Sequence, residues 1–236
     1  MNSPPLRTVR SYVLRSGRKT ESQQRAYEML WPKFGLRTID GIPASLSPDG
    51  HTGEVVLEIG FGMGDSLAEM ASCHPETFFI GIEVHKPGVG RLMNLAEERG
   101  ISNLRIYAED ALEVLEKSVP DHRLSKVQLF FPDPWPKKKH HKRRIVQPSF
   151  ARLVQKKLRP GGVLHMATDW QNYAEQMMEV MSQTEGFANV AGPGQFSPRP
   201  SSRPATKFEQ RGLKLGHGVW DLLFSSSGEG RGSGAT

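Results

Sequence analysis

Short apolar runs and longer amphipathic stretches follow one another along the middle of the chain. Continuous apolar runs predict strands at residues 55–59, 77–83, 104–107, 126–131 and 163–168. Apolar residues at helical spacing predict helices at residues 65–72, 86–99, 150–158 and 172–183, and a short helix from Ala111. Strands and helices that alternate in this way are typical of an α/β fold. We therefore predict a doubly wound, mostly parallel sheet with helices on both faces.

The segments on either side of this region have a different character. Residues 1–19 contain five Lys or Arg and no acidic residue, which predicts a flexible basic arm. Residues 20–53 combine a helix capped at Thr20, which we expect Pro32 to end, with a linker rich in Pro, Ser and Gly. A main domain then spans residues 54–224 and closes with a strand near residues 217–224. The Ser/Gly-rich residues 225–236 are expected to be disordered.

Composition limits the class of protein. The 236 residues are 37% hydrophobic, which is enough for one sizeable core, and no apolar run is long enough to span a membrane. The basic amino terminus lacks the apolar region of a signal peptide, and the single cysteine, Cys73, argues against disulfides and Cys-rich metal sites. We therefore expect a cytoplasmic protein without membrane attachment. The net charge of +6 favours an anionic partner.

The turn after the first predicted strand, residues 60–64, reads GFGMG. Its glycines, including Gly60 and Gly62, let the backbone approach a ligand without obstruction by a Cβ atom. The G-x-G-x-G spacing differs from the dinucleotide fingerprint G-x-G-x-x-G, which argues against NAD, and the chain has no G-x-x-x-x-G-K-[ST] loop for a triphosphate. Glu83, at the end of the next strand, can accept hydrogen bonds from both hydroxyls of a ribose.

Two further carboxylates complete a candidate ligand site. Glu58 lies inside an apolar strand, where a buried carboxylate needs a partner such as a cationic ligand group. Asp110 follows the third strand and either accepts from the amino group of an adenine or caps the next helix; the sequence favours neither. A ligand with a ribose, an adenine-like base, a positive group and no polyphosphate matches S-adenosylmethionine.

The stretch FFPDPWPKKKHHKRR, residues 130–144, joins two chemistries. Asp133 lies in a proline-framed turn beside Trp135, at the carboxyl end of a strand, where ligands bind in open α/β sheets. Six of the last eight residues are Lys or Arg, as many as the net charge of the whole chain. Such a run is either a solvated face or a surface for a polyanion, and its place beside a ligand cleft favours the second. The adjacent His140 and His141 do not form a usual chelating pair, and the surrounding charge repels cations, so no metal site is expected.

These residues match a known family. The chain resembles bacterial tRNA (guanine-N7-)-methyltransferases from about Arg10 to Phe224. The matching motifs are LEIGFGMG at 57–64, GIEVHKPG at 81–88, FFPDPWPK at 130–137, HKRRIVQ at 141–147, ATDW at 167–170 and RPATKFEQRG at 203–212. The resemblance implies a Rossmann-like, class I S-adenosylmethionine-dependent methyltransferase fold. It also implies methylation of N7 of the guanine at position 46, in the variable loop of tRNA.

Carried over position by position, the resemblance assigns roles to individual residues. It places Glu58, Glu83, Asp110 and Asp133 on S-adenosylmethionine, beside the Gly60 and Gly62 turn, and assigns Asp133 to the active site. The residues that it assigns to substrate binding are Lys137, Asp169, Thr206, Lys207, Phe208 and Glu209. The residues that it assigns to contact with RNA are Lys139, His140, His141, Lys142, Arg143 and Arg144.

The reaction itself constrains the mechanism. N7 of guanine carries a lone pair and no proton, so its methylation needs alignment and charge stabilisation rather than a general base. We expect Asp133 to orient the guanine and to offset the positive charge that develops on it. Asp169 and Glu209 are candidates to accept from the guanine N1–H and amino group. Trp135 or Phe208 is expected either to stack on the base or only to pack within the protein.

Two other functions are compatible with parts of this pattern. A methyltransferase for a small molecule or a protein would explain the ligand site but would leave the cationic run unused. An RNA-binding protein without activity would explain the cationic run but not the complete set of ligand-site carboxylates. The sequence shows no feature of an obligate protein partner, so tRNA is the expected partner.

Overall fold

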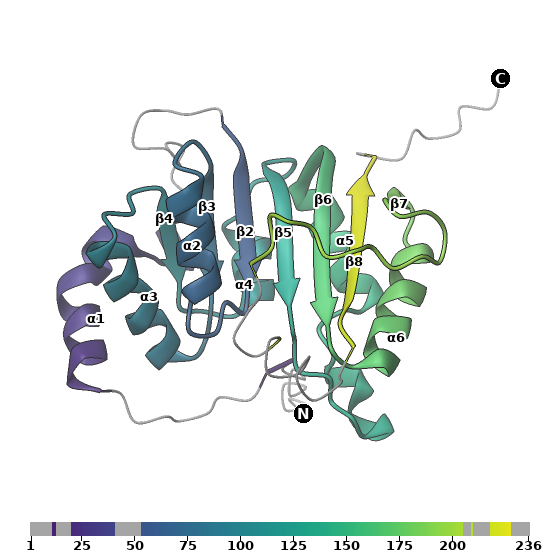
Figure 1. Cartoon of the computed structure of the whole chain (residues 1–236), viewed down its shortest axis with the longest axis horizontal. Coiled ribbons are helices and arrows are strands. Elements are labelled where there is room, and N and C mark those ends of the chain that lie inside the picture. Colours follow the sequence, from purple (N-terminus) through teal and green to yellow (C-terminus); the bar gives the residue numbers. More distant parts are fainter. Residues whose placement is uncertain (1–10, 13–19, 41–52, 205–208, 210–217, 228–236) are drawn as a thin grey trace, which may run out of the picture.

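The computed structural model describes residues 11–12, 20–40, 53–204, 209 and 218–227 (Figure 1). The strands in this part of the chain are β1 (Gly35–Leu36), β2 (Val55–Ile59), β3 (Phe78–Ile82), β4 (Leu104–Tyr107), β5 (Leu124–Phe130), β6 (Leu158–Thr168), β7 (Phe187–Asn189) and β8 (Trp220–Ser226). The helices are α1 (Glu21–Phe34), α2 (Asp65–Cys73), α3 (Lys86–Glu98), α4 (Ala111–Lys117), α5 (Pro148–Lys157) and α6 (Gln171–Ser182), with short 3-10 helices η1 (Thr38–Asp40) and η2 (Lys138–Arg143).

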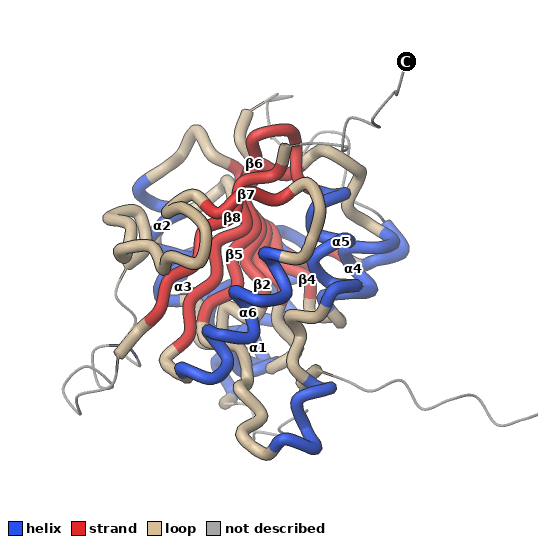
Figure 2. Tube along the Cα trace, turned by 90° about the vertical axis from the view of Figure 1, so that its right-hand side faces the viewer, coloured by secondary structure: helices blue, strands red, loops and turns tan. Residues whose placement is uncertain are grey.

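The strands form one sheet in the order β1-β4-β3-β2-β5-β6-β8-β7. All neighbouring strands are parallel except at β8, which runs antiparallel to both β6 and β7. Figure 2 shows this twisted sheet between helices on its two faces. The predicted doubly wound α/β fold with a mostly parallel sheet is therefore confirmed.

Each face of the sheet has its own apolar core. Leu57 and Ile80 belong to the core that includes residues of α4, α5 and α6, whereas Val56 and Phe79 belong to the core with α1, α2 and α3. Adjacent residues of one strand thus point to opposite cores. This arrangement explains why the parallel strands read as continuous apolar runs rather than as alternating patterns.

The face that carries α1, α2 and α3 is completed by irregular chain. Residues 190–204, which we call the strap, cross this face in front of β8, β6 and β5 (Figure 1). The backbone N–H of Ser197 donates to the carbonyl of Asp221 in β8 at 2.8 Å and so fixes the strap to the sheet.

The start of the described chain differs from the prediction. Helix α1 begins at a capping box formed by Thr20 and Gln23, but Pro32 lies inside the helix and does not end it. The helix continues to Phe34, which is fully buried. A proline so near the last turn removes a single backbone hydrogen bond, and the burial of Phe34 offsets that loss. β1 follows directly and pairs with β4, so residues 20–36 share the sheet and its core.

Other differences concern short elements. β6 begins at Leu158, five residues before the predicted start at Val163: Leu158 pairs with Leu124 and Val163 with Lys126, and the register shifts between these two pairs. β1 and β7, with two and three residues, were too short to be predicted. β8 extends to Ser226, two residues beyond the predicted end of the main domain. None of the described helices has the length and apolar character needed to cross a membrane.

Candidate active site

The direction in which the chain adds strands reverses between β2 and β5. From β2 it proceeds to β3 and β4 on one side, and from β5 to β6 on the other. Open α/β sheets bind ligands at the carboxyl ends of the strands at such a switch point. A cavity of about 440 Å³ lies at this place and has the size of a small-molecule site. Its wall includes Gly60 and Gly62 after β2, Glu83 after β3, and Asp133 after β5.

The glycine turn after β2 forms an open side of the cavity. Gly60 and Gly62 have φ values of 75° and 59°, which side chains other than glycine rarely adopt, and a Cβ atom on either would meet nothing within 4 Å. The N–H of Gly62 donates to Glu83 Oε2 at 2.9 Å, and the N–H of His85 donates to Glu83 Oε1 at 2.8 Å. Glu83 is thus fixed in orientation at the cavity wall, and its role as a ribose-binding carboxylate stays a prediction.

Glu58 is the penultimate residue of the buried strand β2, directly before Ile59 and Gly60, which line the cavity. Its side chain is 3% exposed, and Oε2 has no hydrogen-bond partner among the described residues. Burial, together with the nearby negative charge of Glu83, raises the pKa of Glu58 from 4.5 to about 8. A positive ligand group near this carboxyl would favour its charged form. Glu58 itself does not line the cavity.

The turn that carries Asp133 is strained on both sides of this residue. Phe131 and Trp135 have φ values of 51° and 43°, which are costly for aromatic residues. Backbone and side-chain contacts hold the turn in this conformation. The N–H of Phe131 donates to the carbonyl of Ala167 at 2.8 Å, and the Nε–H of Arg144 donates to the carbonyl of Pro134 at 2.8 Å. Asp133 is exposed at the mouth of the cavity, where a substrate can reach it.

Arg144, predicted to contact RNA, instead belongs to the protein interior. It is 2% exposed and donates to Pro134, to Gln176 at 2.6 Å and to Asn172 at 2.9 Å, with its guanidinium 4.7 Å from the centre of the Tyr173 ring. Burial lowers the pKa of Arg144 from its ordinary value. The prediction for this residue was wrong, because the chain turns inward at the end of η2 and places the guanidinium between the Asp133 turn and α6.

The other cations of the run remain on the surface. Exposed side chains are Lys137, Lys138, Lys139, Lys142 and Arg143. Removal from water and the neighbouring Lys and Arg charges lower the pKa of His140, so this residue adds no charge near neutral pH.

Trp135 links the basic run to the amino-terminal arm. The guanidinium of Arg143 lies 4.7 Å from the centre of the Trp135 ring, and the indole N–H donates to the carbonyl of Ser11 at 3.2 Å. Ser11 and Tyr12 also line the cavity. One face of the indole is therefore covered by Arg143, which leaves at most the other face for a stacked base.

The chain is similar to known proteins over most of its length. Residues 52–222 match the model of a family described as "Putative methyltransferase". The chain is 63% identical over 219 residues to the tRNA (guanine-N(7)-)-methyltransferase of Alcanivorax borkumensis, covering 93% of this chain and 92% of the relative. It is 57% identical to that of Pseudomonas aeruginosa, covering 93% of this chain and 90% of the relative.

The chain belongs to the tRNA (guanine-N(7)-)-methyltransferase family. The family, the enzyme class and S-adenosylmethionine as methyl donor, all expected from the sequence motifs, are confirmed. The structure of the 16S rRNA methyltransferase KamB shares the fold with a TM-score of 0.54 and 14% identity, covering 91% of this chain and 97% of that one. At that identity the likeness supports the methyltransferase fold and nothing more specific.

The cavity of this methyltransferase fits S-adenosylmethionine. The open glycine turn leaves room for a ligand against the backbone, and the carboxylates of Glu83 and Asp133 line the same cavity. The N–H of Gly62, which in a phosphate-binding loop would point at the ligand, donates to Glu83 instead. The site therefore suits a ribose-containing, cationic ligand and does not suit a polyphosphate.

Two other residues predicted to bind the cofactor or the substrate, Asp110 and Asp169, do not line this cavity. Asp110 caps α4, since its Oδ1 accepts from Leu112 at 2.9 Å and from Glu113 at 3.2 Å, while the adjacent Glu109 lines the cavity. Asp169 follows β6 and is half-buried at the same edge of the sheet.

The late substrate motif is described only in part. Thr206, Lys207 and Phe208 lie outside the described residues, whereas Glu209 is 3% exposed and hydrogen-bonded to Arg203. This burial favours Asp169 over Glu209 as the acceptor for the guanine edge.

Gly88 is the last residue of the motif GIEVHKPG, and no role was predicted for it from the sequence. A Cβ atom at Gly88, in the first turn of α3, would lie 1.9 Å from the carbonyl oxygen of Gly62. Glycine therefore permits α3 to approach the glycine turn closely. The signal available in the sequence was a glycine early in a predicted helix, where it costs helical stability and needs a packing reason.

We expect Gly88→Ala to weaken binding of S-adenosylmethionine about tenfold, because relieving the clash with Gly62 strains the turn by about 1–3 kcal/mol. Isothermal titration calorimetry with the purified variant measures the affinity. Gly90→Ala is the matched control: it lies in the same helix, but its Cβ would come 3.0 Å from the carbonyl oxygen of Gln23 in α1, away from the cavity. Unchanged affinity in Gly88→Ala would contradict the prediction.

Proposed function

We propose that the protein transfers the methyl group of S-adenosylmethionine to N7 of a guanine in tRNA, at position 46 of the variable loop. The observation that carries the proposal is the strained turn that presents Asp133 at the mouth of the cavity, directly before the exposed basic run. A methyl donor site and a polyanion-binding surface thus meet at one residue. The family relationship supports tRNA as the polyanion.

The cofactor would be held by residues from the ends of three strands. Gly60 and Gly62 would allow it to lie against the backbone, and Glu83 would accept from the ribose hydroxyls. The carboxyl of Glu58, behind the wall, would interact with its positive charge. Asp110, at the cap of α4, would accept from the amino group of the adenine. When bound, S-adenosylmethionine supplies an electrophilic methyl group on a sulfonium.

Asp133 acts on the guanine rather than on a proton. Because N7 has a free lone pair, the enzyme needs no base at this position. The carboxylate of Asp133 orients the purine for in-line attack and offsets the positive charge that develops on the ring. Asp169 accepts from the N1–H and amino group of the guanine. The exposed Lys137 and the segment 206–209 contribute further contacts with the tRNA.

Methyl transfer from labelled S-adenosylmethionine to unmodified tRNA, followed by nucleoside analysis, tests the function. We expect label in 7-methylguanosine, and no label in a tRNA in which the guanine at position 46 is replaced by adenine. Label in another nucleoside would contradict the proposed target atom. Label in a small molecule or a protein, and none in tRNA, would favour the alternative class of methyltransferase. The proposed place of action is the cytoplasm, with no obligate protein partner.

Binding of tRNA should depend on salt through the exposed cations. Neutralisation of about five phosphates predicts a log–log salt slope of roughly −3.5 for tRNA binding. We expect the slope to flatten by about 3 units in a variant in which serine replaces four of these cations, namely Lys138, Lys139, Lys142 and Arg143. Arg144 is left intact because its side chain is buried.

Filter binding or fluorescence anisotropy at several salt concentrations measures the slope. A control variant replaces four exposed cations elsewhere on the molecule: Lys33, Arg99, Lys117 and Lys156. Equal slopes in the two variants would show that the run from Lys138 to Arg143 is only a solvated face.

A further inference from the structure

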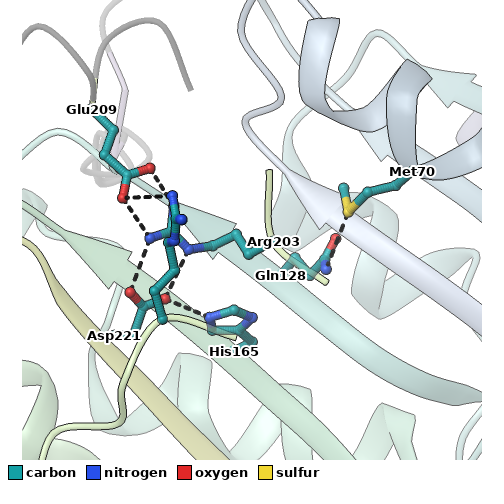
Figure 3. A network of polar contacts seen from close by, with 7 residues as sticks. Met70, Gln128, His165, Arg203, Glu209 and Asp221 are labelled. Carbon is teal, nitrogen blue, oxygen red and sulfur yellow. Dashed lines mark hydrogen bonds and ion pairs between the residues drawn. The ribbon is translucent and has the colours of Figure 1, made fainter. Parts of the chain in front are cut away.

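A group of buried charged side chains lies beneath the strap (Figure 3). Asp221 Oδ1 is 2.7 Å from His165 Nε2 and accepts from Arg203 Nε at 2.9 Å, while Asp221 Oδ2 accepts from Arg203 Nη2 at 3.0 Å. Arg203 Nη1 and Nη2 donate to the two oxygens of Glu209 at 2.7 and 2.8 Å. None of these four residues is more than 3% exposed.

Arg203 is the cation that the two carboxylates of this group share. Although burial alone would raise it, hydrogen bonds from His165 and Arg203 lower the pKa of Asp221, so the carboxylate is ionised at neutral pH. Burial lowers the pKa of His165, which therefore donates as a neutral imidazole. One guanidinium thus serves two buried carboxylates, with a second cation, Arg199, 4.0 Å from Glu209. Loss of Arg203 would remove the cation that both buried carboxylates share.

Arg203 also contacts the base of the Asp133 turn. Its guanidinium lies 5.7 Å from the ring centre of Phe130 and 5.8 Å from that of Phe131. Phe131 is the first strained residue of the turn and lines the cavity. On the opposite side, Glu209 is the last residue of the segment 206–209. Arg203 is therefore in contact with Glu209, which the family resemblance assigns to the substrate, and with the start of the turn that carries Asp133.

We propose that Arg203 is a positioning residue for methyl transfer. It holds Glu209 beside Asp221 of β8, and its guanidinium packs against Phe131, two residues before Asp133. The inference rests on the proposed function, since it concerns the alignment of guanine between these two parts. Arg203 itself touches neither the methyl donor nor the reacting atoms.

The geometry requires arginine rather than any cation. The planar guanidinium donates through Nη1 and Nη2 to Glu209 and through Nε and Nη2 to Asp221. The ammonium of a lysine is a single charged group with three donors, and it cannot form paired hydrogen bonds with two carboxylates at once. Arg203→Lys thus keeps the charge and removes the alignment.

Steady-state methylation kinetics with Arg203→Lys test the proposal. We expect kcat to fall about 10- to 100-fold, because a displacement of about 1 Å in a reacting group has an effect of this size. The KM for tRNA and the affinity for S-adenosylmethionine should stay within about threefold, because the exposed cations supply most of the tRNA affinity and Arg203 does not line the cavity. Asp221→Asn removes the carboxylate of β8 that accepts two hydrogen bonds from Arg203. It should therefore displace the guanidinium and also lower kcat.

A double-mutant cycle separates positioning from general destabilisation. If Arg203 acts through Glu209, Arg203→Lys should lower kcat less than about threefold further when Glu209 is already replaced by glutamine. Lys157→Met is the control for loss of a buried cation. Lys157 is 5% exposed and pairs with Asp121 at 2.7 Å, at the opposite end of β6, so this change should lower Tm and leave kcat unchanged.

The outcomes distinguish this inference from the proposed function. Absence of 7-methylguanosine with the wild-type protein would overturn the proposed function and the inference together. An active wild type with kcat unaffected in both Arg203→Lys and Asp221→Asn would overturn the inference alone. Additive losses in the cycle would also overturn it, because they would show that Arg203 does not act through Glu209.

Discussion

Replacing Asp133 by alanine is expected to lower kcat for tRNA methylation by about 10²- to 10³-fold, the usual effect of removing a group that stabilises developing charge. Asp133 lines the cavity and is exposed, so the change should neither unfold the protein nor open a hole in its core. Binding of tRNA should weaken by less than about 1 kcal/mol, as expected for one exposed charge. Single-turnover methylation and a separate binding assay measure the two effects.

A second variant separates the charge of Asp133 from its shape. Asp133→Asn keeps the size of the side chain but removes the negative charge, and we expect it to lose most of the activity that alanine loses. Glu113→Gln, an exposed carboxylate on α4 paired with Lys117, is the control and should keep full activity. If Asp133→Ala turned over at the wild-type rate, the central role given to this residue would be wrong.

Replacing Glu58 by glutamine is expected to stabilise the substrate-free protein increasingly as the pH rises. The pKa of Glu58 is raised from 4.5 to about 8, so between these values the folded protein retains a proton that the unfolded chain releases. This group therefore favours the folded state fully below pH 4.5, and its contribution is lost as the pH rises to about 8. At pH 7 the loss is on the order of 3 kcal/mol, from about 1.4 kcal/mol for each pH unit.

The measurement is the difference in unfolding free energy between wild type and Glu58→Gln, from urea titrations between pH 5 and 8. The slope of this difference against pH is the test, since any fixed effect of the amide on packing cancels. The neighbour of Glu58 across the β2–β5 pair is Gln128, whose Oε1 also lacks a hydrogen-bond partner among the described residues. Glu54→Gln, an exposed carboxylate four residues earlier, is the control. A slope of zero for Glu58→Gln would contradict the raised pKa.

The sequence predicted the parts of the fold that rest on long apolar periodicity. The strands of residues 55–59 and 104–107 and the helix that starts at Lys86 appear where they were expected. Elements that depend on tertiary contacts were missed. β1 exists because Phe34 and Leu36 pack into the core, and no pattern can predict a strand of two residues. The helix also passed Pro32, because packing of Phe34 overrode a local stop signal.

The candidate site shows a similar division. Residues fixed by a strand end, such as Glu83 and Asp133, lie on the cavity because parallel strands bring their carboxyl ends together. Arg144 and Arg203 could not be separated from surface cations by sequence, because their partners lie far along the chain, at Gln176 and Asp221. Whether an arginine faces water or the interior is decided by the path of the chain.

The two edges of the sheet have a consequence for how the protein behaves at high concentration. An edge strand offers unpaired N–H and C=O groups to which another chain can add a strand, and long, flat edges promote aggregation. Here the edge strands β1 and β7 have two and three residues, and the longest strand, β6, lies inside the sheet. Two copies of the protein therefore find almost no template for joining their sheets. In the part of the chain that the structure describes, this broad, mostly parallel sheet is thus protected from edge-to-edge association by its two shortest strands.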